Sequence, residues 1–142
     1  MKIVIDTNIL VGALLREGGA ARAVLRLCLD RKVEPLVGVA LFCEMEDVLA
    51  RSGLFRSSPL DQQERHDFFA AFLNITNWVT IYYRWRPNLR DEADNHVVEL
   101  AVAGSASYIV TQNSRDFAEM ELRFPGLKVV TAAEFLELWR AR

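Results

Sequence analysis

The chain begins Met-Lys-Ile-Val-Ile-Asp-Thr-Asn at residues 1–8, and this stretch decides the fold. Residues 3–5 form a short β-branched run without polar alternation, which is typical of a strand buried on both faces. Asp6 follows the run directly. In an open α/β sheet, ligands bind at the carboxyl ends of the strands. The sequence therefore leaves two interpretations of Asp6: a cap for the next helix, or a charge held where it can grip a cation.

Beyond this start, short apolar runs alternate with helical patterns. Further strands are expected at residues 34–37, 79–82, 108–110 and 129–130, and helices at 9–15, 20–31, 40–50, 60–75, 93–103 and 132–139. Asp61 and Thr131 are expected to cap the helices after them, and Gly104 to end the helix before it. This alternation predicts a three-layer α/β/α fold with a central parallel sheet, and the absence of linkers predicts one domain over residues 1–142.

Composition narrows the class of protein. The chain has 142 residues, of which 51% are hydrophobic and 25% charged, which favours an ordinary globular domain with a core. The net charge of -2 excludes strong whole-molecule steering towards nucleic acid, so a local basic patch or metal ions would have to hold such a partner. No signal peptide or membrane span is recognisable, and we expect a cytoplasmic protein in which Cys28 and Cys43 are buried free thiols.

Several acidic residues fall just after strands or at helix starts, where α/β folds gather their loops. Besides Asp6, they are Glu44, Asp91, Asp94 and Asp116. Each alone has a structural explanation as a cap, a helix-start charge or a surface residue. Several carboxylates in one crevice would repel one another unless a cation neutralised them. Oxygen ligands with few His or Cys favour Mg²⁺ or Mn²⁺ over Zn²⁺, and such ions activate water for phosphodiester cleavage.

These motifs, in this order, resemble the PIN domain family, and within it the VapC-type ribonucleases, the toxins of bacterial and archaeal toxin–antitoxin systems. The resemblance covers nearly the whole chain. It rests on Ile-Asp-Thr-Asn-Ile-Leu at 5–10, Glu44 before Asp-Val-Leu at 47–49, Arg-Asp-Glu-Ala-Asp-Asn at 90–95 with Glu-Leu-Ala at 99–101, Ile-Val-Thr at 109–111 before Asn113 and Asp116, and the closing segment 130–136. It implies a metal-dependent endoribonuclease that cuts RNA, forms a homodimer and is covered by an antitoxin partner.

Carried over residue by residue, the resemblance implies that Asp6, Glu44 and Asp94 line the metal site and carry the catalysis. The implied cofactor is Mg²⁺ or Mn²⁺. Asp91 lies about one helical turn before Asp94, and it is either a supporting ligand or a helix-start residue.

This chain departs from the family pattern at the position of the fourth acidic residue. That acid usually follows Thr111 by two positions, where this chain has Asn113. An amide oxygen can ligate a metal but brings no charge, so we expect Asp116 to complete the site and the metal affinity to be weaker. The departure motivates an alternative function: a catalytically weakened PIN-fold protein that binds RNA or an antitoxin without cutting. Phosphoryl transfer of the haloacid-dehalogenase kind is a poorer alternative, since it needs an Asp where this chain has Asn8.

Other polar residues near the motifs are expected to be structural. Asn8 is expected to hold the loop around Asp6 through side chain–backbone hydrogen bonds. Thr7 and Thr111 could orient carboxylates or water, but a role as structural caps is the preferred interpretation for each. His66 is expected to face solvent. His96 lies close to Asp94 in the sequence, but the chemistry described needs no imidazole.

One basic-aromatic cluster could hold substrate. Arg84, Arg86 and Arg90 surround Trp85, and arginines on phosphates beside an aromatic surface for a base are a common way of gripping single-stranded RNA. The alternative is that Trp85 packs against the core or a second subunit while the arginines are solvated.

Overall fold

The computed structural model describes residues 1–81, 95–117, 124 and 126–142. Its strands are β1 (Lys2–Ile5), β2 (Glu34–Val37), β3 (Asn77–Trp78), β4 (Tyr108–Val110) and β5 (Lys128–Val130). They form one sheet in the order β3-β2-β1-β4-β5, and every neighbouring pair is parallel. The predicted parallel sheet is therefore confirmed.

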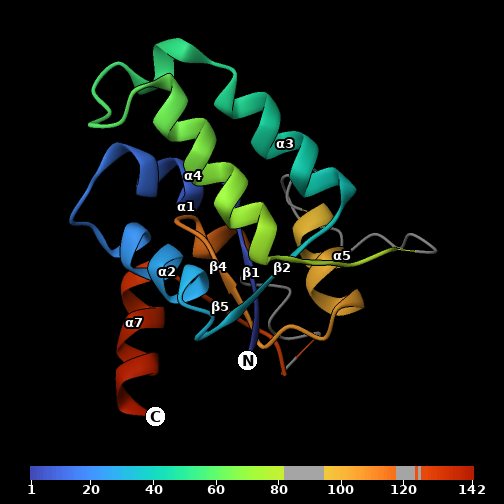
Figure 1. Cartoon of the computed structure of the whole chain (residues 1–142). Helices are drawn as coiled ribbons and strands as arrows, with labels where there is room; N and C mark the ends of the chain where they lie inside the picture. Colours follow the sequence, from blue (N-terminus) through green and yellow to red (C-terminus); the bar gives the residue numbers. More distant parts are fainter. Residues whose placement is uncertain (82–94, 118–123, 125) are drawn as a thin grey trace.

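Helices cover both faces of this sheet. They are α1 (Thr7–Leu15), α2 (Ala20–Leu29), α3 (Val39–Leu49), α4 (Gln62–Ile75), α5 (Asn95–Ala103) and α7 (Ala132–Ala141), with 3-10 turns η1 (Ser52–Phe55) and η3 (Ser114–Phe117). On one side α2 packs against α1, α4 and α7, while α5 packs on β1, β2 and β4 from the other side (Figure 1). The predicted three-layer α/β/α architecture is thus confirmed. Helix α3 contacts both α1 and α5, so it links the two helical layers.

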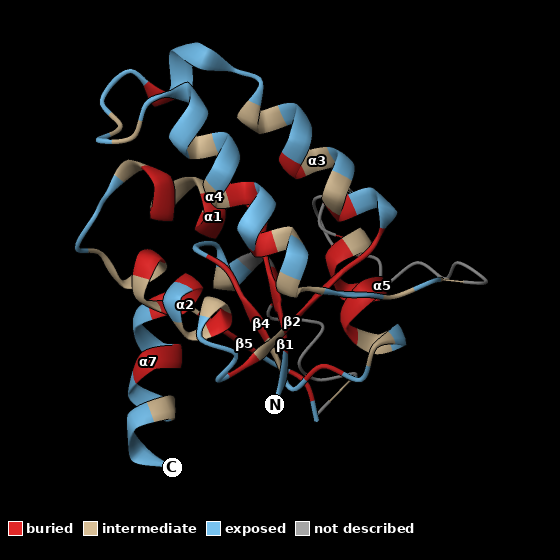
Figure 2. Cartoon of the chain, in the orientation of Figure 1, coloured by how far each residue is buried: buried red, intermediate tan, exposed pale blue. Residues whose placement is uncertain are grey.

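The centre of the sheet is the most buried part of the molecule (Figure 2). Strand β1 lies between β2 and β4, with Val4 opposite Leu36 and Ile109. Residues 3–5 of β1 are at most 1% exposed. The run lacks polar alternation because both faces of the strand are covered by helices, as the sequence predicted.

Most predicted element boundaries agree with the structure to within a few residues. The strand expected at 79–82 is wrong over residues 79–81, and residue 82 lies outside the described residues. Strand β3 is Asn77–Trp78, and it pairs with Leu36 and Val37 at the end of β2. Val79 still donates its backbone N–H to the Val37 carbonyl at 2.8 Å. Strand β2 ends at Val37 and is followed by α3, so beyond Val79 the described part of the chain offers no further β2 residue for β3 to pair with.

Capping predictions are confirmed, and one cysteine prediction is wrong. Asp61 and Thr131 each form a capping box at the start of α4 and α7. Cys28 and Cys43 are both free thiols, and Cys28 is buried, where loss of hydration raises its thiol pKa to about 12. Cys43 is exposed instead of buried, because it lies on the solvent side of α3. None of the described helices is long and apolar enough to cross a bilayer.

Candidate functional site

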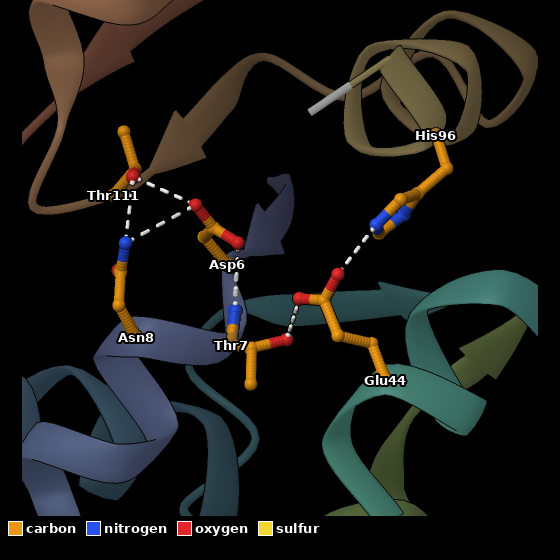
Figure 3. Close-up of polar contacts among 6 residues, drawn as sticks. All are labelled: Asp6, Thr7, Asn8, Glu44, His96 and Thr111. Atoms are coloured by element: carbon orange, nitrogen blue, oxygen red, sulfur yellow. Dashed lines mark hydrogen bonds and ion pairs between the residues drawn. The ribbon is translucent and has the colours of Figure 1, made fainter. Parts of the chain in front are cut away.

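Asp6 lies at the carboxyl edge of the sheet, between β1 and β4. Its backbone N–H donates to the Val110 carbonyl at 2.9 Å. Its Oδ1 accepts the backbone N–H of Thr7 at 2.8 Å, as the N-cap of α1. Its Oδ2 accepts the Thr111 hydroxyl at 2.8 Å and the Asn8 amide at 3.3 Å (Figure 3). Asp6 is therefore a helix cap, and its second carboxylate oxygen is held in place by Asn8 of the same helix and by Thr111, which follows β4.

Glu44 reaches the same place from α3. Its Oε1 accepts the hydroxyl of Thr7, and its Oε2 lies 2.9 Å from Nε2 of His96 on α5 (Figure 3). Thr7 thus donates its backbone N–H to Asp6 and its hydroxyl to Glu44. The two carboxylates meet here because α3 packs against both α1 and α5.

The pKa values of the two carboxyl groups are shifted in opposite directions. Burial raises the pKa of Asp6, and this outweighs the hydrogen bonds from Thr111 and Thr7, while the negative charge of Glu44 raises it further. The hydrogen bond from His96 lowers the pKa of Glu44, with help from Thr7 and against a smaller effect of burial. A cation between the two side chains would favour the ionised form of both.

Both carboxylates line one cavity of about 750 Å³. Its polar side includes Asn8, Gln112 and Asn113, which follow β1 and β4. The far side is mainly apolar and comes from α1, α2, α3 and the start of α7, including Val11, Leu15, Ala21, Val48 and Ala132. A cavity of this size is typical of binding sites for small molecules or for short segments of a larger partner.

The structure brings together part of the predicted site. Asp6 and Glu44 meet as predicted, and Asn113 lines the same cavity, with its backbone N–H donating to the Thr111 hydroxyl at 3.2 Å. Asp116 falls in η3, but its side chain is outside the described part of the structure. The remaining predicted residues also lie outside the described residues: Asp91, Asp94, Arg84, Arg86 and Arg90.

The donor atoms that meet here suit a hard divalent cation. Among the residues that the structure describes, no three His, Cys, Asp or Glu side chains converge closely enough to hold a metal ion. Within the described part of the chain, Asp6 and Glu44 are the residues that supply carboxylate oxygens to this cavity. Mg²⁺ is commonly held by one or two carboxylates and several waters, so this pair fits that class of ion.

Sequence reasoning missed one residue of the site and underrated two others. His96 contacts Glu44 directly, although it was expected to take no part. Thr7 and Thr111 orient carboxylates through their hydroxyls and are more than caps. The expectation for Asn8 is confirmed, since its Oδ1 accepts the backbone N–H of Gln112 at 3.2 Å. The only sequence signal for His96 was its place near the start of a helix that carries the third motif.

Comparisons with known proteins bear on the fold and on the family of the chain. Among solved structures, the chain is similar to one described as "Crystal structure of VapBC2 from Rickettsia felis bound to a DNA fragment from their promoter", with a TM-score of 0.58 and 17% identity, over 91% of this chain and 97% of that one. At this identity the likeness shows a shared fold. A search of curated proteins finds no match. A family model described as "PIN domain" matches residues 2–115, and the chain therefore belongs to the PIN domain family.

Proposed function

We propose that this chain is a divalent-metal-dependent endoribonuclease and the toxin of a toxin–antitoxin pair. The observation that carries the proposal is the meeting of Asp6 and Glu44 in one cavity at the carboxyl edge of a parallel sheet. The PIN domain match and the fold shared with a VapBC protein support it.

In this proposal Asp6 and Glu44 hold Mg²⁺ or Mn²⁺, and the other ligands come from the later motifs: Asp94, Asp116, Asp91 and Asn113. When bound, the ion supplies an activated water and stabilises the leaving oxygen in phosphodiester hydrolysis. The hydroxyls of Thr7 and Thr111 keep the two carboxylates oriented before the ion arrives. The arginines at 84, 86 and 90 are proposed to hold RNA phosphates.

The proposed protein partner is an antitoxin. The similar structure from Rickettsia felis is of VapBC2 bound to promoter DNA, and this supports a cognate partner for the present chain. A segment of that partner laid over the apolar side of the cavity would cover the acidic residues. We further propose that the chain is cytoplasmic and forms a homodimer.

The test is RNA cleavage by the full chain with Mg²⁺ or Mn²⁺. Asp6→Asn is expected to lower the rate by at least about 100-fold, because it removes a charged ligand where even outer-shell changes cost about 10- to 100-fold. Asp47→Asn is the matched control, since Asp47 lies on the same helix as Glu44 but is exposed and pairs only with exposed Arg51 in the described structure. Cleavage that survives both a chelator and Asp6→Asn would refute the proposal. Incubation with a single-stranded DNA of the same sequence tests whether cleavage requires the 2′-hydroxyl of RNA.

The second candidate is a PIN-fold protein that binds RNA or an antitoxin without cutting. It is favoured by one observation: Asn113 lines the cavity at the position where the family usually has an acid. Mn²⁺ titration separates the two candidates. RNA binding without specific metal binding supports the second, whereas saturable metal binding that Asp6→Asn removes supports the nuclease.

A further inference from the structure

His96 contacts Glu44 at the candidate site, and the proposed phosphodiester hydrolysis assigns no role to this contact. Its Nε2 lies 2.9 Å from Oε2 of Glu44, and the two side chains are 19% and 34% exposed. His96 is the second residue of α5, and Glu44 lies on α3. The contact therefore joins helices from the two layers of the fold, directly beside the candidate metal site.

The direction of this hydrogen bond follows from its atoms. An ionised carboxylate only accepts hydrogen bonds, so Nε2 of His96 must carry the proton. Its Nδ1 is buried and finds no hydrogen-bond partner among the described residues. In the described structure the ring is therefore bound to the site through the single bond to Glu44.

The Glu44 carboxylate is fixed at both oxygens. The Thr7 hydroxyl donates to Oε1 from α1, and His96 donates to Oε2 from α5. A free glutamate side chain loses rotamer entropy when it is ordered. Two donors on opposite oxygens impose that order before a ligand binds. Each carboxylate oxygen has two lone-pair directions, so both oxygens keep one for a cation.

We propose that His96 is a positioning residue, which holds the Glu44 carboxylate in the orientation that a divalent cation needs beside Asp6. The proposal rests on the metal site of the proposed function, and it assigns no proton transfer to the imidazole. Partners that orient a metal ligand typically change metal affinity by about 10- to 100-fold when they are removed. The same range is expected here, because the hydrogen bond is 2.9 Å long, partly buried and made to a charged acceptor.

The experiment is a calorimetric titration of the full chain with Mn²⁺, independent of any cleavage assay. His96→Leu removes the donor at similar volume and is expected to raise the Kd for Mn²⁺ by about 10-fold or more. His96→Gln places an amide N–H near the position of Nε2 and is expected to recover most of the affinity. His66→Leu is the control, since His66 is exposed on α4 and should leave the Kd unchanged.

Rescue by Gln separates positioning from a general loss of structure. If His96→Leu does not fold, His96→Asn replaces it, because its shorter amide cannot reach Glu44. Wild-type affinity in the Leu or Asn variant would overturn the proposal, and so would equal losses in the Gln variant and the variant without the donor. A wild-type chain that binds no Mn²⁺ overturns both this proposal and the metal site. A chain that binds Mn²⁺ but cuts no RNA refutes only the nuclease, and the variants then still decide the role of His96.

Discussion

Asp6 combines two roles that the sequence presented as alternatives. One carboxylate oxygen caps α1, and the other is held by Thr111 and Asn8 next to Glu44. Capping places the charge at the positive end of the helix dipole, and it also fixes the side chain at the carboxyl edge of the sheet. The same local geometry that begins the helix therefore builds the site, so a capping role is no argument against a functional one.

The burial of Asp6 has a consequence for stability without metal. Its folded-state pKa lies above the unfolded value of 3.8, so the folded chain holds the proton more tightly. The corresponding stability is present below pH 3.8 and is lost as the pH rises through the folded pKa. Asp6→Asn carries no charge at any pH and is expected to unfold at higher denaturant concentration than the wild type near pH 7. That advantage should shrink as the pH falls through the pKa of Asp6.

The measurement is urea unfolding of both chains from about pH 8 to about pH 4 in the presence of a chelator. Asp47→Asn, at an exposed position, should show no comparable gain near pH 7. If Asp6→Asn were less stable than the wild type at every pH, the three groups that donate hydrogen bonds to the carboxylate would outweigh its burial. A gain in stability with a loss of cleavage would be the trade-off expected at an active site.

At the scale of single elements, α2 and α5 end in the same way. Each closes with a Schellman motif, and the residue in the left-handed region is Arg31 (φ 59°) or Ser105 (φ 56°). The sequence correctly predicted that α5 stops near Gly104, but Gly104 does not occupy the left-handed position. A Cβ on Gly104 would lie 2.5 Å from Cδ1 of Leu36 in β2, so the glycine allows the helix end to pack closely on the sheet, and a larger residue would have to displace Leu36.

Two substitutions at this helix end are expected to have opposite signs. Gly104→Ala should lower the free energy of unfolding by about 1 to 3 kcal/mol, the usual cost of overpacking a core. Ser105→Gly should raise it by up to about 1 kcal/mol, because glycine adopts positive φ without strain. Urea unfolding measures both, with Gly53→Ala as the control, since a Cβ there has no neighbour within 4 Å. If Gly104→Ala had the same free energy of unfolding as the wild type, the buried Leu36 side chain would have to move aside at little cost.

The end of α1 depends on side chains from other elements. The last four carbonyls of a helix lack partners within it. Here Nε of Arg22 donates to the Ala13 carbonyl and the Ser58 hydroxyl to the Leu14 carbonyl, both at 2.7 Å. Arg22 is only 8% exposed and its guanidinium lies over the ring of Phe68. A buried arginine on α2 thus helps to cap the C-terminal end of α1, the helix that Asp6 caps at its N-terminal end.

Arg22→Met is expected to lower the free energy of unfolding by about 1 to 3 kcal/mol, because it leaves the buried Ala13 carbonyl without a donor. Chemical denaturation measures the loss, and Arg26→Met on the exposed side of the same helix should be nearly neutral. The Nη2 atom of Arg22 has no hydrogen-bond partner in the described structure. A more stable Arg22→Met variant would show that the desolvation of this atom outweighs the cap.

At the scale of the whole molecule, the sequence predicts those strands and helices whose position depends on their own residues. Uninterrupted β-branched runs and three-four periodicity located the buried strands and most helices, because each pattern reflects the burial of its own element. Strand β3 was misplaced because its end depends on where β2 stops. The Asp6–Glu44 pair followed from the family motifs, whereas the contact between Glu44 and His96 joins residues 52 apart and depends on how α3 packs between α1 and α5. Such a contact has no local signature.

The metal site predicts a property of the whole chain that needs no substrate. A ligand that binds only the folded state stabilises it by RT ln(1 + [L]/Kd), which is about 2.7 kcal/mol at 100 times the Kd. The thermal midpoint of the wild type should therefore rise by several degrees with Mn²⁺ and continue to rise with its concentration. Asp6→Asn should show little of this rise, although it is expected to be the more stable chain without metal. Differential scanning calorimetry at fixed pH would test both. An equal rise of the thermal midpoint in the two chains would mean that Mn²⁺ binds elsewhere. The proposed metal site at the carboxyl edge of the sheet would then be refuted.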